Sequence, residues 1–174
     1  MTNFARIIPI VKYDKVSYYS VCVDESEKSL FDDFIKHHTK HNKEKLNHVL
    51  EWLKQIGNKY GAQQHLFRSE AKFADASALP PIGMEREPTY SEYGKIKANN
   101  LRLYCLRANQ HVVFLFDGDI KTTDLAQNCP NVKDYFKKAN QLTKAIDNAF
   151  RSRDIVWNDD CTEIECDDDF KLQF

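Results

Sequence analysis

Hydrophobic residues gather in two short stretches near the start of the chain, at residues 6–12 and 17–24. Both stretches are rich in Ile, Val and Tyr, which favour strands, and the turn-prone residues 13–15 separate them. The pattern therefore predicts two strands that form a hairpin.

Apolar residues then recur at helical spacing over two segments. Ser29 is a good helix N-cap, and Asp32 places an acidic group in the first turn of the helix that follows. Asn42 begins a second helical pattern that runs to Tyr60, where Gly61 is a good stop. Together these segments predict an αα-hairpin.

The middle of the chain contains the clearest strand signal. The runs Leu101–Arg107 and His111–Phe116 are apolar and are separated by a three-residue insert that fits a turn, so we predict a β-hairpin. A strand is also expected at His65–Ala74. The stretch Leu79–Asn100, which contains three prolines and two glycines, is expected to be a long loop.

The last part of the chain predicts one long helix and a polar end. A helix is expected from Val132 to Arg153, after the start signal Pro130, with an apolar stripe that ends at Phe150. Beyond it, Thr162–Cys166 alternates in a way that fits a short edge strand. The fold class expected is α+β, with an antiparallel sheet and with the αα-hairpin and the C-terminal helix packed on one face of it.

Charge is distributed unevenly along the chain. From residue 154 onward there are eight acidic residues and one basic residue, while residues 1–153 hold 24 basic and 18 acidic residues. A mildly basic body fits an anionic partner, although an ordinary solvated surface gives the same count. We therefore expect one domain over residues 1–153, and residues 154–174 as an acidic C-terminal tail or edge strand.

Several function classes lose support. The sequence has no apolar run long enough for a membrane span and no secretory leader pattern, so we expect a cytoplasmic protein without membrane contacts. The five cysteines form no C-x-x-C pair, which argues against a disulfide framework and against a cysteine zinc site. P-loop, G-x-S-x-G, G-x-G-x-x-G and H-E-x-x-H motifs are absent.

A cluster of histidines suggests metal binding at first sight. His37 and His41 are four residues apart, on one helical face, and His38 and His48 lie nearby. However, no acidic or cysteine residue at a useful spacing completes a ligand set. We therefore expect a solvated helix junction, with no metal site and no cofactor.

The predicted central hairpin presents a set of polar residues that suits phosphate. Arg102 and Tyr104 are two residues apart in a strand and so share a face, which we expect to be open, while Leu101, Leu103 and Cys105 face the helices. A guanidinium and a phenol there suit phosphate binding and base stacking. A surface arginine beside a packed tyrosine is the alternative interpretation.

Two further cations belong to this description. Lys121 follows the hairpin in the sequence GDIKTT and could meet a phosphate as a mobile point charge, or be a solvated loop lysine. Arg107 falls on the opposite face of an ideal strand from Arg102.

The order of elements and these residues resemble the RelE/HigB/ParE superfamily of toxin–antitoxin systems, most closely its HigB-like branch. The resemblance rests on LRLYCLRANQHVVFLFDGDIKTTDLAQNCPNVKDYFKKA and on the upstream segment LFRSEAKFADASALPP, and covers residues 17–153. It implies that residues 1–153 form a single RelE-like domain.

The resemblance also implies a function. Members are small ribonucleases, many acting on messenger RNA in the ribosome, in which the 2′-hydroxyl attacks the neighbouring phosphate. By position, Arg102 and Lys121 would stabilise the transition state, and Tyr104 would stack a base or assist proton transfer. Arg68 and Arg107 would bind RNA. The implied partners are an antitoxin protein and RNA or the ribosome.

Two alternatives stay open. Asp117 and Asp119 lie close to Lys121 in sequence and would weaken phosphate binding, so a catalytically inactive protein-binding module is the second hypothesis, with Tyr90 and Tyr93 as anchors. The acidic tail would either fold over the basic face as a phosphate mimic or be a frayed terminus.

Overall fold

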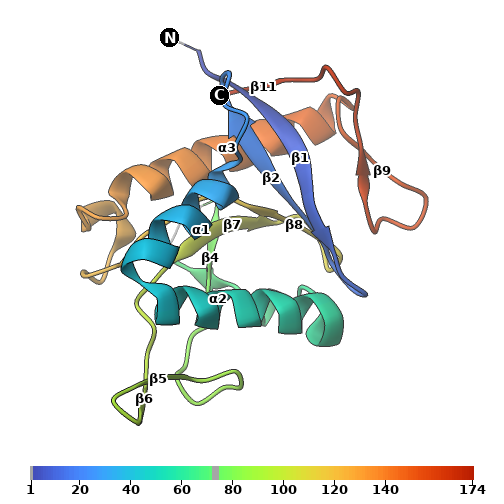
Figure 1. Cartoon of the computed structure of the whole chain (residues 1–174). Helices are drawn as coiled ribbons and strands as arrows, with labels where there is room; N and C mark the ends of the chain where they lie inside the picture. Colours follow the sequence, from blue (N-terminus) through green and yellow to red (C-terminus); the bar gives the residue numbers. More distant parts are fainter. Residues whose placement is uncertain (1, 72–74) are drawn as a thin grey trace.

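The structure, a computed structural model, describes residues 2–71 and 75–174. Its main sheet has the strand order β11-β1-β2-β8-β7-β4-β3 (Figure 1). The strands of this sheet are β1 (Phe4–Lys12), β2 (Ser17–Val23), β3 (Arg68–Ser69), β4 (Ser77–Leu79), β7 (Leu103–Arg107), β8 (Val112–Leu115) and β11 (Leu172–Gln173). The expected α+β class is confirmed.

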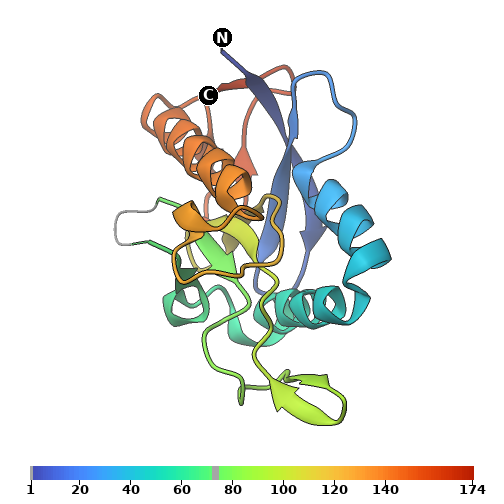
Figure 2. The ribbon, with the colours of Figure 1, turned by 90° about the vertical axis from the view of Figure 1, so that its left-hand side faces the viewer.

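Three α-helices cover the two faces of this sheet. They are α1 (Leu30–His41), α2 (Lys43–Gln55) and α3 (Lys133–Arg151). Figures 1 and 2 show α1 and α2 on one face and α3 on the other, so the expectation that the helices pack on one face is wrong. The core is accordingly divided: Leu103 and Cys105 of β7 pack with α1 and α2, whereas Tyr104 and Leu106 pack with α3. Period-two alternation in a strand buried on both sides produces this division.

The start of α1 follows the sequence prediction. Ser29 accepts a hydrogen bond from the N–H of Asp32, and the carboxylate of Asp32 accepts one from the N–H of Ser29, which is a capping box. The second helix begins after Asn42, whose side chain instead contacts His38. Its last turn is a π-helix (Ile56–Tyr60) that ends at Gly61 with a φ of 73°, as the stop signal predicted.

The central hairpin is confirmed as β7 and β8, with Cys105 opposite Leu115 and Arg107 opposite Val113. Strand β8 is fully buried, since it also pairs with β2 on its other side. The start of β7, together with Arg102 before it, also stays paired with the segment that follows β8. The N–H of Tyr104 donates to the carbonyl of Asp117, and the N–H of Arg102 donates to that of Asp119.

The prediction of a purely antiparallel sheet is wrong at one place. Strands β2 and β8 run parallel, with Tyr18 opposite Val113. All other neighbours in the sheet are antiparallel among the described residues. Sequence adjacency favours hairpins, but this pairing joins strands about ninety residues apart and follows from how the helices pack on the sheet.

The segment between α2 and β7 is more structured than expected at one point and less at another. The predicted strand 65–74 is reduced to a short 3₁₀ turn (Gln64–Leu66) and β3, and its residues 72–74 lie outside the described residues. The predicted loop contains a small hairpin of β5 (Tyr90–Glu92) and β6 (Lys95–Lys97), which projects away from the sheet (Figure 2).

The acidic end of the chain is packed, so the frayed terminus is wrong. Strands β9 (Val156–Trp157) and β10 (Ile164–Glu165) form a hairpin, and β11 adds to the edge of β1. Leu172 is buried against the α3 side of the core. This edge of the sheet is opposite the edge formed by β3, so the tail does not fold over Arg102 and Tyr104. Apolar residues between the acidic ones drive this packing.

No helix among the described residues is long and apolar enough to cross a lipid bilayer.

Candidate functional site

The sequence-predicted residues Arg68, Arg102 and Tyr104 lie on the α3 side of the sheet. Arg68 pairs with Ala78, and Ala78 pairs with Tyr104, so these residues form a row across β3, β4 and β7. The expectation that this face is open is wrong, because α3 covers it and the ring of Phe136 lies 5.4 Å from that of Tyr104. The site is therefore a buried cluster instead of a surface patch.

Glu70 is the centre of this cluster. Its Oε1 atom lies 2.8 Å from Nε of Arg102, and its Oε2 atom contacts Nζ of Lys121. The Arg102 guanidinium also donates to the carbonyl of Asn99 at 2.8 Å. One carboxylate thus holds together two cations that are 19 positions apart in the chain, and a charged group is tolerated inside because it is paired.

Sequence reasoning missed Glu70, although a signal for it existed. It stands two residues after Arg68 and so shares a strand face with it. We name Arg68, Glu70, Arg102, Tyr104 and Lys121 the Glu70 cluster.

The Glu70 cluster carries more positive than negative charge. Three of its side chains are cationic and one is anionic. Arg68 donates to the carbonyls of Pro80 at 2.8 Å and Pro81 at 3.0 Å, so it has no carboxylate partner among the described residues. Burial, and then the neighbouring Arg102, lower the pKa of Arg68 to about 10. This surplus favours an anion.

Tyr104 contributes an unsatisfied hydroxyl. Its side chain is completely buried, and its OH has no hydrogen-bond partner among the described residues. Burial, and then the Glu70 carboxylate, raise the pKa of the phenol well above its usual range. The phenol therefore stays protonated, and it suits hydrogen-bond donation better than proton abstraction.

Cys129 borders the Glu70 cluster and was not singled out from the sequence. Burial opposes its ionisation, but hydrogen bonds from Thr122 and from the N–H groups of Asn131 and Val132 outweigh it and lower the thiol pKa to about 6. The N–H of Thr122 lies 3.3 Å from the sulfur. Cys129 thus connects Thr122, which follows Lys121, to the start of α3.

Arg107 does not join the other predicted residues. It lies on the α2 side of the sheet, where its Nε donates to the carbonyl of Ala62. Alternation along β7 puts it on the opposite face from Arg102, as the strand geometry predicts.

A basic hollow of about 340 Å³ lies next to the cluster on α3. Its lining is cationic or polar apart from one ring, and comprises Gln127, Lys133, Phe136, Lys137, Asn140, Gln141 and Lys144. Phe136 contacts both this hollow and Tyr104. We name it the lysine groove. Lysines beside an aromatic ring suit a phosphate backbone with its bases.

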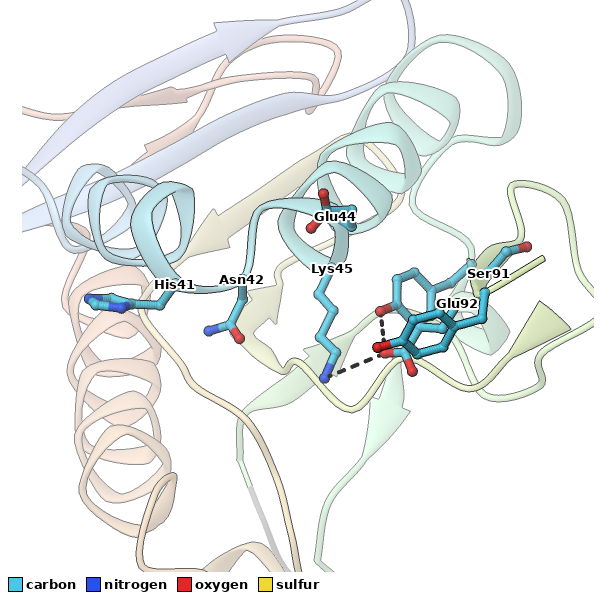
Figure 3. A pocket seen from close by; sticks show the side chains of 8 residues that line it. His41, Asn42, Glu44, Lys45, Ser91 and Glu92 are labelled. Carbon is cyan, nitrogen blue, oxygen red and sulfur yellow. Dashed lines mark hydrogen bonds and ion pairs between the residues drawn. The ribbon is translucent and has the colours of Figure 1, made fainter. Parts of the chain in front are cut away.

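A larger pocket, of about 500 Å³, lies between α2 and the β5–β6 hairpin (Figure 3). Within it, the hydroxyl of Tyr90 donates to Glu92 at 2.6 Å, and Nζ of Lys45 lies 4.0 Å from the same carboxylate. Tyr90 is buried and cannot be a binding anchor, which corrects that expectation, whereas Tyr93 is 99% exposed. Three of the polar side chains that line this pocket, Lys45, Tyr90 and Glu92, thus contact one another.

Comparison with known proteins identified no matching family model, no matching curated protein and no matching solved structure.

Proposed function

We propose that this protein is a toxin-like ribonuclease of RelE/HigB type, acting in the cytoplasm and controlled by an antitoxin. The observation that carries the proposal is the convergence of Arg68, Arg102, Tyr104 and Lys121 around Glu70. Arg102, Tyr104 and Lys121 were selected from the sequence pattern around the predicted hairpin and Arg68 from the resemblance, and the four are spread over residues 68–121 of the chain. Arg102 and Lys121 both contact the Glu70 carboxylate, and this pair of contacts suits one anion.

In this proposal the substrate phosphate displaces Glu70. A carboxylate that bridges Arg102 and Lys121 makes the same contacts that two phosphate oxygens would make. When Glu70 is displaced, the two cations stabilise the extra charge of the phosphorane, and the protonated Tyr104 hydroxyl gains an acceptor. The free protein is then held in an inhibited state by its own side chain.

The reaction is transesterification. The 2′-oxygen forms a bond to the adjacent phosphorus, the bond from phosphorus to the 5′-oxygen breaks, and the proton of the 2′-hydroxyl leaves as the 5′-oxygen gains one. The products are a 2′,3′-cyclic phosphate and a 5′-hydroxyl.

In this proposal the lysine groove binds the phosphate backbone of the RNA. Lys133, Lys137 and Lys144 lie on one side of α3 and span about 16 Å along the helix axis, at 1.5 Å per residue. Their contacts with phosphates make binding fall steeply as salt increases. Replacing Lys133 and Lys137 by glutamine is expected to reduce RNA affinity about tenfold and to flatten this salt dependence.

The test combines growth and RNA integrity. Induced expression of the wild-type chain is expected to arrest growth and to cleave messenger RNA in a translating extract, while Arg102→Gln and Lys121→Gln relieve both effects. Arg107→Gln is the matched control, since this arginine lies on the other face. If the wild-type chain is harmless and RNA stays intact with and without ribosomes, the proposal fails.

One observation favours a second function, a non-catalytic protein-binding module. Glu70 and Tyr104 are sealed beneath α3, which would leave exposed groups such as Tyr93 to act. A photo-crosslinker at position 93 would then capture one discrete partner in cells, and the same group at the exposed Glu85 would not. Growth arrest that depends on Arg102 would contradict this function.

A further inference from the structure

Two histidines of α1 meet an aspartate from a distant part of the chain. His37, His38 and Asp119 each offer one potential ligand atom, and these atoms all lie within 4.8 Å of one another. Asp119 is 81 positions beyond His38, so no local spacing pairs it with the histidines. The fold supplies the carboxylate that sequence spacing could not reveal.

The parallel strand pair explains why these residues meet. Because β8 runs parallel to Ser17–Tyr19 of β2, both segments leave this pairing in the same direction, β2 toward α1 and β8 toward Asp119. The hydroxyl of Ser20 donates to the carbonyl of Leu115 at 2.6 Å and accepts from the N–H of Phe31 at 3.3 Å, which ties the start of α1 to the end of β8. Ligand sites commonly lie beyond the carboxyl ends of parallel strands.

The backbone at Asp119 is held rigidly. The N–H of Arg102 donates to the carbonyl of Asp119 at 3.0 Å. Gly118 lies so close to the backbone of Arg102 that an added Cβ would be 1.8 Å from the Arg102 carbonyl oxygen. A carboxylate on such a fixed segment is preorganised as a ligand.

The surroundings of His38 suit coordination. Its Nε2 lies 3.0 Å from the carbonyl oxygen of Gly118, the residue before Asp119, so this nitrogen faces the segment that carries the carboxylate. Its Nδ1 lies 2.9 Å from the amide of Asn42. If that amide turns over, its oxygen accepts the Nδ1 proton, which leaves the Nε2 lone pair free for a metal.

We propose that His37, His38 and Asp119 bind a divalent zinc ion. Two imidazoles and one carboxylate form a borderline donor set that suits zinc better than magnesium or calcium. His37 is exposed and His38 is buried, so one side of the ion faces solvent and can hold water. Three protein ligands with an open position are typical of zinc sites that do chemistry.

The zinc site is independent of the ribonuclease proposal, because it shares no side chain with the Glu70 cluster. It is tested on the full chain after chelator treatment and dialysis. Calorimetric titration with zinc is expected to give one site, and cobalt is expected to give visible ligand-field bands at the same stoichiometry.

Variants locate the ligands. His37→Ala and Asp119→Asn are each expected to weaken zinc binding about 100-fold or more, since even outer partners of metal ligands contribute 10- to 100-fold. Asn42→Asp is expected to tighten it, because a carboxylate is a better acceptor for the Nδ1 proton of His38. His65→Ala is the control, since His65 is exposed elsewhere.

Three results would overturn the proposal: no stoichiometric zinc or cobalt binding, unchanged affinity in Asp119→Asn, or an equal loss in His65→Ala. His38 is buried and its replacement could unfold the chain, so the two exposed or half-buried ligands decide the outcome. Circular dichroism of each variant confirms that a loss of binding is not a loss of fold.

Discussion

The Nε atom of Arg102 lies 2.8 Å from the Oε1 atom of Glu70, with side chains that are 11% and 2% exposed. In a buried ion pair of this kind, each charge compensates the cost of removing the other from water. Removing one partner leaves the other inside the protein without compensation. This relationship connects the stability of the fold to the proposed site, since the same carboxylate stands where a substrate phosphate would bind.

Replacing Glu70 by glutamine is expected to lower the free energy of unfolding by about 3–5 kcal/mol, because Arg102 and Lys121 lose their buried counter-charge. Urea denaturation measures this loss. Glu163→Gln is the matched control, since its ion pair with Lys12 is exposed and should change stability by no more than about 1 kcal/mol.

Phosphate is expected to restore part of that loss. If Glu70 occupies an anion site, inorganic phosphate should raise the melting temperature of Glu70→Gln more than that of the wild-type protein. Equal shifts in the two proteins would argue against displacement of Glu70 by a phosphate group.

Replacing Tyr104 by phenylalanine is expected to leave stability unchanged or to raise it by about 1 kcal/mol. The hydroxyl is buried without a partner among the described residues, so its removal relieves a desolvation cost. The same change is expected to reduce ribonuclease activity, because the phosphorane loses a donor. A destabilisation of 2 kcal/mol or more, on the scale of about 1–3 kcal/mol for a lost buried hydrogen bond, would show that the hydroxyl is paired.

Gly118→Ala is expected to cost about 3 kcal/mol or more, since the added Cβ would collide with the backbone carbonyl of Arg102. Gly94→Ala is the control for backbone strain without a collision, because Gly94 has a φ of 76° and open space around it. Its replacement should cost about 1–2 kcal/mol. Thermal unfolding of the two variants makes the comparison, and equal losses would contradict the close approach at Gly118.

The thiol of Cys129 is expected to make stability depend on pH. Its pKa of about 6 in the folded protein is below the ordinary value of about 8.5, so the folded state loses this proton first. The resulting stabilisation is complete above about pH 8.5 and is lost as the pH falls through about 6. Denaturation curves measured between these pH limits should show that the free energy of unfolding of the wild-type protein rises with pH, and that this rise is smaller in Cys129→Ser. The same pH dependence in both proteins would contradict the prediction.

Leu172→Ala is expected to destabilise the fold by about 2–4 kcal/mol, because the side chain is 2% exposed and closes the core beside β1. Gln173→Ala, one residue further along the same strand and exposed, should have an effect within about 0.5 kcal/mol. If the two variants are equally stable, the end of the chain is not part of the core.

Local signals in the sequence predicted most of the elements that the structure contains. Ser29 and Asp32 are three positions apart and form a complete capping box, so the start of α1 needed no tertiary information. Gly61 ended the second helix and the two apolar runs around residues 108–110 became β7 and β8 for the same reason. Where the signal was weaker, as at residues 65–71, the strand was much shorter than predicted.

The candidate site was only partly predictable. The alternation of Arg102, Tyr104 and Arg107 along one strand correctly divided them between two faces. Their burial was not predictable, since alternation does not say whether a helix will cover a face. The sequence also suggested that Asp119 lies close enough to Lys121 to weaken phosphate binding there. In the structure Lys121 contacts Glu70 instead, and the Asp119 carboxylate lies near His37 and His38.

The sequence by itself determined the helices, the central hairpin and the types of residue available for chemistry, because capping, periodicity and turn preference act within a few positions. Only the tertiary structure decided the parallel pairing of β2 with β8, the meeting of Glu70 with Arg102 and Lys121, and the meeting of Asp119 with the histidines. Those contacts join residues far apart in the chain, and they form when burial of two apolar sheet faces brings the segments together, which leaves no local pattern in the sequence.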